Sequence, residues 1–282
     1  MKWSRFYVTL FIASFAFISC SDNGDSNNQG TNTATQSSTS PTTATATIVP
    51  SNAKEKIPDV VVKGLKGKVE VLSESIFKAE PSKKLSSKNV FKYDANGNMT
   101  ELANYSSDGK LVSTIKTTYD ASGNPISEET ILGNGNVDLR STIKADAKGN
   151  RIEQNDVKTD PTGTLFNFKQ FYSYDEKGQL IERAVYRDNG AFFYKYGFAY
   201  DGSGNKTEWT RLTSSNAVLG KVVYKYNDKN NLIEQNEYEG ASTLKSSFTF
   251  TYEYDKKGNW IRQNKLQDNQ VIEIKERQIT YD

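Results

Sequence analysis

Histidine is absent from this sequence of 282 residues, and cysteine occurs once. Without histidine, the chain lacks the commonest general base and the commonest transition-metal ligand, and it cannot form a Ser-His-Asp triad. A single cysteine cannot form an internal disulfide or a cysteine-rich zinc site. We therefore expect a protein without enzymatic activity, resident metal or cofactor.

The net charge is also small, because 36 basic side chains nearly balance 34 acidic ones and leave a formal charge of +2. That balance argues against a nucleic-acid partner held by net charge. Aromatic residues and glycine, by contrast, are abundant, with 16 Tyr, 14 Phe and 19 Gly. The composition therefore says more about architecture than about a reaction.

The first twenty residues have the pattern of an export signal. Lys2 and Arg5 precede an apolar run over residues 6–18, which is shorter than the ~20 residues that span a bilayer. Ser19 stands directly before Cys20, and this junction resembles the lipobox of bacterial lipoproteins in a relaxed form. The resemblance implies that residues 1–19 are a signal peptide and that Cys20 carries lipid at the mature N-terminus. An ordinary signal peptide with an incidental cysteine is the alternative.

Lipid on Cys20 would attach the chain to a membrane, since buried acyl methylenes contribute ~0.8 kcal/mol each. Ser21 directly after it resembles a signal for the bacterial outer membrane. Residues 20–53 are rich in Ser, Thr, Asn and Gln, and they cannot bury enough apolar surface to fold. We expect a disordered tether with a reach of ~30 Å, on either the periplasmic or the outer side.

From residue 93 onward the chain is periodic. A Tyr-Asp pair or a variant of it recurs every 26 to 29 residues, at Tyr93, Tyr119, Ala145, Tyr174, Tyr200, Tyr226, Tyr254 and Tyr281. A second, looser turn signal, such as Asp188-Asn189-Gly190, falls between successive pairs. Recurrence of this kind predicts a repeat architecture in which each unit is one β-hairpin.

The fixed positions of the motif Tyr-Asp-x-x-Gly-Asn are those of a turn. The aspartates can accept N–H groups of a type I turn, and the glycines supply the positive φ of a G1 bulge. Calcium is the alternative role for such carboxylates, but each turn offers only one, and the glycine comes too early for an EF-hand loop. The turn residues predicted in this way are Asp94, Gly97, Asp120, Gly123, Gly149, Asp175, Gly178, Asp201, Gly204, Asp255 and Gly258.

Side chains alternate along the segments between the turns, as in Tyr194, Tyr196 and Phe198. We expect an all-β fold in which about seven antiparallel hairpin repeats over residues 93–282 form one large curled sheet, spiral or barrel-like. Sheets of this size rarely stay flat and open. Residues 54–92 would form an N-terminal hairpin that caps the first sheet edge.

One strand face should carry a column of glutamates: Glu101, Glu153, Glu182, Glu208 and Glu234. Two carboxyl groups ~5–9.5 Å apart could serve as the acid and base of a glycosidase. Cross-strand pairing with lysine explains a repeated column more simply, so we expect pairing.

The opposite face offers a possible binding platform of four aromatic side chains: Tyr194, Tyr196, Trp209 and Trp260. These rings could stack against a sugar or a hydrophobic partner. Filling the core of the sheet is the simpler role and the one we favour. Whether this face is covered decides between the two roles.

The motif and its spacing over about residues 69–282 resemble the YD repeat of Rhs-type proteins, and especially short YD-repeat lipoproteins of unknown function in Gram-negative bacteria. The resemblance implies a β-hairpin array and no particular activity. Long Rhs proteins coil such repeats into a shell around a toxin. This chain has seven units and no C-terminal toxin segment, so we do not expect it to enclose one.

Together these patterns predict a lipid-anchored outer-membrane protein that displays a repeat domain and binds glycan, matrix or an envelope protein. A structural or cage-like repeat protein without a ligand is one alternative, and a glycan-active enzyme is another. The residues leave the oligomeric state open.

Overall fold

The computed structural model describes residues 63–79, 81–159 and 163–282, and every regular element in them is a β-strand. The all-β prediction is therefore confirmed for this part of the chain. The predicted signal peptide, Cys20 and the tether over residues 20–53 lie outside the described residues. Among the residues that are described, no helix is long and apolar enough to cross a membrane.

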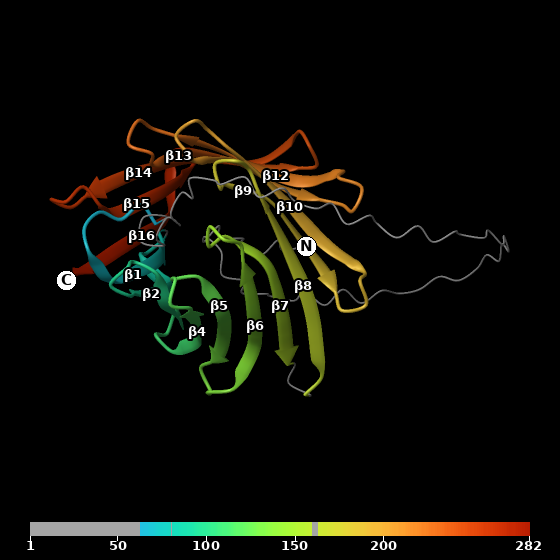
Figure 1. The fold of residues 1–282 in the computed structure, drawn as a ribbon. Coiled ribbons are helices and arrows are strands. Elements are labelled where there is room, and N and C mark those ends of the chain that lie inside the picture. Colours follow the sequence, from blue (N-terminus) through green and yellow to red (C-terminus); the bar gives the residue numbers. More distant parts are fainter. Residues whose placement is uncertain (1–62, 80, 160–162) are drawn as a thin grey trace. The chain divides into compact units, whose positions relative to one another are not determined.

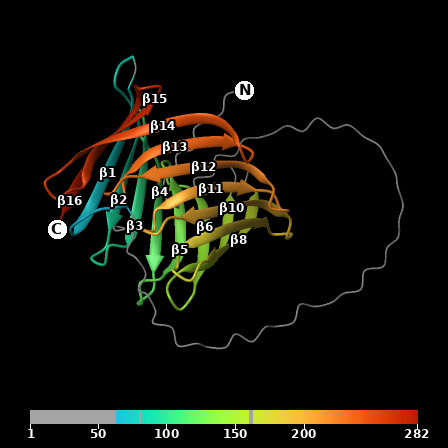
Figure 2. The same cartoon turned by 90° about the horizontal axis from the view of Figure 1, so that it is seen from above.

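Sixteen strands follow one another along the chain and pair antiparallel with their neighbours. They are β1 (Val69–Lys78), β2 (Lys84–Tyr93), β3 (Met99–Ser106), β4 (Leu111–Tyr119), β5 (Pro125–Leu132), β6 (Val137–Ala145), β7 (Arg151–Thr159), β8 (Leu165–Tyr174), β9 (Leu180–Arg187), β10 (Phe192–Tyr200), β11 (Lys206–Leu212), β12 (Val218–Tyr226), β13 (Leu232–Glu239), β14 (Thr243–Tyr254), β15 (Trp260–Gln267) and β16 (Gln270–Tyr281). Because β1 also pairs with β16, the sheet closes into a barrel (Figure 1). Figure 2 shows β12 and β13 running across the direction of β4.

This closure corrects the expected fold class. The expectation of a curled array of about seven hairpin repeats is wrong, because the sheet is a closed barrel of sixteen strands. In an open array, β1 and β16 would each expose a row of unpaired N–H and C=O groups, and their pairing satisfies both rows. Leu72 on β1 consequently lies opposite Phe91 on β2 and Ile279 on β16.

Seven turns at one end of the barrel share one geometry. Between β2 and β3, Asp94 Oδ1 accepts the backbone N–H groups of Asn96 and Asn98, each at 2.9 Å, and Gly97 has a φ of 78°. After the turn, a β-bulge adds one residue at the start of the following strand, such as Thr100 on β3 and Ile126 on β5, and this sets which side chains of that strand face inward. The same acceptor contacts recur around Asp120, Asp146, Asp175, Asp201, Asn227 and Asp255. The equivalent glycines with positive φ are Gly123, Gly149, Gly178, Gly204 and Gly258.

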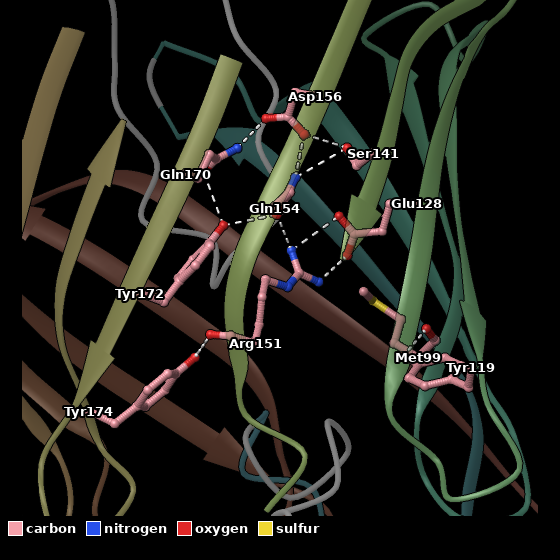
Figure 3. Close-up of polar contacts among 10 residues, drawn as sticks. All are labelled: Met99, Tyr119, Glu128, Ser141, Arg151, Gln154, Asp156, Gln170, Tyr172 and Tyr174. Atoms are coloured by element: carbon pink, nitrogen blue, oxygen red, sulfur yellow. Dashed lines mark hydrogen bonds and ion pairs between the residues drawn. The ribbon is translucent and has the colours of Figure 1, made fainter. Parts of the chain in front are cut away.

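Tyrosine hydroxyls connect successive turns. Tyr119 Oη donates to the carbonyl of Met99 at 2.8 Å, and Tyr174 Oη donates to the carbonyl of Arg151 at 2.8 Å (Figure 3). Each accepting carbonyl belongs to the first strand residue after the preceding turn. The tyrosine of the motif therefore ties its own strand end to the start of the neighbouring strand. An equivalent bond joins Tyr226 to Lys206, and on β14 it is Tyr252, two residues before the motif tyrosine Tyr254, that donates to Leu232.

The last turn is used to close the barrel. In four other turns, the asparagine amide of the motif donates to the aspartate of its own turn. Asn259 instead donates to the carbonyl of Lys66 at 3.0 Å and accepts the Lys66 N–H at 2.6 Å. Tyr281, at the end of β16, donates to Asp255 Oδ2 at 2.8 Å. The final motif thus joins the segment before β1 to the end of β16.

Alternate side chains face into the barrel and away from it. Buried apolar residues on the inner face include Leu72, Phe91, Leu102, Ile115, Ile143, Phe168, Val185, Val222 and Phe250. The glutamate column lies on the outer face, and the prediction that it pairs with lysine is confirmed. The pairs, at 2.9 to 3.7 Å, are Glu101–Lys92, Glu153–Lys144, Glu182–Lys195, Glu208–Lys221 and Glu234–Lys225. Exposed pairs contribute about 0–1 kcal/mol each, and they keep the outer face charged.

A buried ion pair lies in the seam between β1 and β16. Arg277 Nη2 and Nε each lie 2.9 Å from Glu74 Oε1, and Lys63 Nζ lies 3.8 Å from Glu74 Oε2. The Arg277 guanidinium also lies 3.3 Å from the centroid of the Trp260 ring. Burial raises the pKa of Glu74, but Lys63, Lys275 and Arg277 outweigh burial and hold the pKa at about 2. A one-residue slip of the seam would separate these charges, so they favour the observed register.

Replacing a turn glycine tests the backbone requirement. Gly178 has a φ of 77°, and nothing lies within 4 Å of an added Cβ, so Gly178→Ala adds backbone strain and no clash. We expect a loss of about 1 kcal/mol in the free energy of unfolding, measured with urea. Gly202→Ala is the control, because that site is equally open and has no positive φ. Equal losses at both sites would contradict the assigned turn geometry.

Glu74→Gln tests the seam. At neutral pH the variant should lose about 3 kcal/mol of unfolding free energy, because Arg277 and Lys63 stay buried without a counter-charge. The pKa of Glu74 is lowered from 4.5 to about 2 by folding, so its stabilisation is present above about pH 4.5 and lost as the pH falls toward 2. The difference in unfolding free energy between wild type and variant should therefore shrink in that window. A difference that stays constant from neutral pH to about pH 3 would exclude this role for Glu74.

Candidate binding site on the inner face of the barrel

Aromatic side chains line the inner face across β8, β10 and β11. Strand alternation turns Phe168, Tyr194, Tyr196 and Trp209 inward, and a β-bulge at the start of β10 brings Phe193 into contact with them. Successive ring centroids along this series are 5.4, 5.0, 4.9 and 5.1 Å apart. We call these five residues the aromatic run. Tyr194, Tyr196 and Trp209 are only half-buried, so their rings are not fully covered by the protein.

A buried polar network borders the aromatic run on β5 to β8 (Figure 3). Asp156 is 1% exposed, and it accepts hydrogen bonds from Ser141 Oγ at 2.6 Å, from Gln154 Nε2 at 2.7 Å and from Gln170 Nε2. Gln154 and Gln170 are buried as well. Protein donors therefore replace water around this carboxylate, as a buried charge requires.

Arg151 and Glu128 complete the polar network, and Figure 3 shows them below Asp156. Arg151 Nη2 lies 2.6 Å from Glu128 Oε1, and Arg151 Nη1 donates to Gln154 Oε1 at 2.6 Å. Burial lowers the pKa of Arg151, but Glu128 outweighs burial and the pKa lies above its ordinary value. The guanidinium is therefore charged at every physiological pH, and its charge is matched by Glu128.

Arg183 on β9 joins the polar network to the aromatic run. Its Nε donates to Gln170 Oε1 at 2.7 Å, and its guanidinium carbon lies 5.9 Å from the Tyr172 centroid and 6.0 Å from the Tyr194 centroid. Burial raises the pKa of Tyr172, Tyr194 and Tyr196, so these hydroxyls stay protonated at neutral pH and can donate. Aromatic faces, hydroxyl donors and a guanidinium thus share one surface. Apolar walls with a few placed polar groups are typical of small-molecule sites.

The structure divides the predicted platform of four aromatic residues. Tyr194, Tyr196 and Trp209 lie together in the aromatic run. Trp260 lies on β15 against Tyr252, at a centroid distance of 5.9 Å, and lines a separate pocket of about 360 Å³. Three of the four predicted residues therefore form one surface, and the fourth belongs to the neighbourhood of the closing seam.

The turn aspartates are not brought together. Each accepts hydrogen bonds within its own turn, as Asp120 and Asp201 do. Within residues 63–79, 81–159 and 163–282, no group of three or more His, Cys, Asp or Glu side chains could hold a metal ion. The predicted lipid site, Cys20, lies outside those residues.

The polar network and Arg183 are missing from the sequence-based expectations. Gln154, Asp156 and Gln170 are polar residues within strands, and no motif of the sequence singles them out. The sequence of β8 does contain a signal. Gln170 and Tyr172 follow Phe168 at every second position, so strand alternation places all three on one face, and all three are buried. If alternate residues are counted from each turn glycine, and one residue is added for the bulge, these polar side chains fall at inward-facing positions.

No family model matches this chain. No curated protein matches it either. Among solved structures, a porin-like protein from Bacteroides uniformis is similar, with a TM-score of 0.53 and 10% sequence identity over 75% of this chain and 98% of that one. That likeness shows the fold alone, which is a closed antiparallel β-barrel.

Two further likenesses have lower TM-scores and carry no argument. A porin-like protein from Bacteroides vulgatus has a TM-score of 0.31 and 12% identity, over 77% of this chain and 99% of that one. The Tc holotoxin pore of Photorhabdus luminescens has a TM-score of 0.27 and 15% identity, over 68% of this chain and 12% of that one. The resemblance to YD-repeat lipoproteins therefore stays a prediction from the sequence.

Asp156→Ala tests the polar network. The change removes the acceptor of three buried donors, so we expect the unfolding free energy to fall by about 3 kcal/mol in urea denaturation. Asn155→Ala on the outer face of the same strand is the matched control and should cost under about 1 kcal/mol. If Asp156→Ala cost no more than this control, the network would not stabilise the inner face.

Proposed function

We propose that this chain is a lipid-anchored protein of the bacterial outer membrane whose barrel binds an oligosaccharide on its inner face without catalysing a reaction. The observation that carries the proposal is the aromatic run, in which Tyr194, Tyr196 and Trp209 stack 4.9 and 5.1 Å apart and remain half-buried. Barrels of sixteen strands have interiors too wide for side chains to fill, which agrees with this partial exposure.

The chemistry of the surface suits a sugar. A pyranose ring has an apolar C–H face and a polar rim of hydroxyls. The rings of Tyr194, Tyr196 and Trp209 offer flat partners for the C–H face, and the Arg183 guanidinium and the Tyr196 hydroxyl offer donors for the rim. A purely structural barrel is the alternative, and it differs from this proposal in predicting no affinity for any oligosaccharide.

The outer face supports anchoring through lipid rather than a barrel set into the bilayer. A membrane barrel carries an apolar band about 25 Å tall toward lipid. Here the outer face carries Lys–Glu pairs on strands around the circumference, from Lys92–Glu101 on β2 and β3 to Lys225–Glu234 on β12 and β13. Charges in those positions favour water, so the lipid predicted on Cys20 is the membrane attachment that we propose.

The carboxylates support a binding role rather than catalysis. The glutamate column pairs with lysine on the outer face, away from the aromatic run. On the inner face, Glu128 is engaged by Arg151, and Asp156 accepts three hydrogen bonds. A glycosidase needs one carboxyl free to donate a proton and another free to attack or to activate water.

The test is a titration of the full-length protein in detergent micelles with a panel of oligosaccharides, followed by calorimetry and tryptophan fluorescence. We expect at least one class to bind, and Tyr196→Ala to weaken that binding about tenfold, because a stacked ring contributes about 1.5 kcal/mol. Phe171→Ala, an aromatic residue 41% exposed on the outer face, is the matched control and should leave the affinity unchanged.

Two results would refute the proposal. One is no binding by any oligosaccharide at up to about 1 mM, which corresponds to about −4 kcal/mol. The other is an equal loss of affinity in Tyr196→Ala and Phe171→Ala, which would place the ligand away from the aromatic run.

A further inference from the structure

Charge is distributed differently on the two faces of the barrel. On the outer face, cations and carboxylates alternate across neighbouring strands, and Arg140 lies 3.0 Å from Glu129 in the same way as the lysines of the glutamate column. On the inner face of β9 to β11, Arg183, Arg187 and Arg211 have no carboxylate within 4.0 Å among the described residues. These three guanidinium ions therefore lack a direct carboxylate partner, and Asp156 is joined to Arg183 only through Gln170.

Each of these arginines borders the aromatic run. Arg183 lies 6.0 Å from the Tyr194 centroid, and Arg187 lies 5.0 Å from the Phe193 centroid. Arg211 is directly opposite Tyr196 in the pairing of β10 and β11. The three cations thus lie along the same surface as the rings, two of them on β9 and one on β11.

Nearby carboxylates are already engaged. On β9 to β11 the acidic residues are Glu182 and Glu208, and both pair with lysine on the outer face. Glu128 on β5 pairs with Arg151. The charge of Arg183, Arg187 and Arg211 is consequently available to a group from outside the chain.

Resting on the proposed function, we propose that the ligand is an acidic oligosaccharide, whose carboxylate or sulfate groups are bound by Arg183, Arg187 and Arg211 while its rings stack on the aromatic run. A guanidinium presents parallel N–H donors that match the two oxygens of such an anion. Arg183 and Arg211 are half-buried, which reduces screening by water and strengthens their contacts, whereas Arg187 is exposed.

A single-stranded nucleic acid would also combine anions with rings. It needs a continuous positive groove along its backbone, with one charge per nucleotide. Arg183, Arg187 and Arg211 are three separate charges on β9 and β11, which is fewer than a phosphate backbone requires, and the chain as a whole has a net charge of only +2. The observations therefore favour separate anionic groups on a sugar polymer.

The test compares ligands that differ only in charge. Full-length protein in detergent micelles is titrated with an oligogalacturonate and its fully methyl-esterified form, and with a sulfated oligosaccharide and its desulfated form. We expect the charged member of at least one pair to bind about tenfold or more tightly, with an affinity that falls as salt is added.

Arg211→Gln should reduce that preference about tenfold, and Arg183→Gln should act in the same direction. Arg140→Gln on the outer face should leave the preference unchanged. Circular dichroism and thermal melting check that each variant is folded.

The outcomes separate this inference from the proposed function. Equal binding of the charged and neutral members would overturn the acidic ligand and leave an oligosaccharide site in place. If no member of either pair binds but neutral sugars of the wider panel do, the acidic ligand is again overturned and the oligosaccharide site is kept. A single-stranded oligonucleotide that binds more tightly than every sugar would overturn the inference. Failure of all sugars would overturn both.

Discussion

The pairing of β1 with β16 is the contact on which the other features of the barrel depend. It joins residues about 200 positions apart, such as Glu74 and Arg277, and leaves neither strand as an open edge. The final turn reinforces it, because Asn259 binds the backbone of Lys66 and Asp255 accepts the hydroxyl of Tyr281. Closure separates an inner face from an outer one, and the aromatic run and the polar network both lie on the inner face.

The two faces have different chemistry because they meet different surroundings. The outer face distributes Lys–Glu pairs, which suit water and contribute little to stability. The inner face combines buried apolar side chains with the polar network around Asp156 and the half-buried aromatic run. Arginines without carboxylate partners among the described residues border that run, as at Arg183 and Arg187. The inner face thus combines charged groups with aromatic rings, which is the combination that the proposed binding function requires.

Local features of the fold were predictable from the sequence, because each depends on neighbouring residues. Asp94 and Gly97 lie within one turn, and the alternation of Tyr194 and Tyr196 places both rings on one face. Closure was not predictable in this way. It depends on strand tilt and stagger accumulated over sixteen strands, and no short segment encodes that sum.

The same limit applies to the site. The sequence groups Trp260 with Trp209 because both are aromatic and lie in the repeats, but the structure places them on β15 and β11, with different neighbours. Polar side chains such as Gln154 and Asp156 were not predicted as part of the site, because their burial depends on hydrogen-bond partners that the fold supplies. The type of a residue indicates which chemistry it can contribute, but the strand pairing of the barrel determines which residues lie together in one site.

Hydrogen–deuterium exchange of the full-length protein along β1 and β16 tests the closed barrel most directly. In the closed sheet both strands have hydrogen-bonded partners on each side, so their central amides should be protected as strongly as those of β8. An open array would leave alternate amides of β1 and β16 unpaired, and these would exchange rapidly. Uniform protection along Leu72–Phe77 and Ile274–Ile279 is the predicted result, and rapid exchange at alternate positions there would contradict the closed barrel.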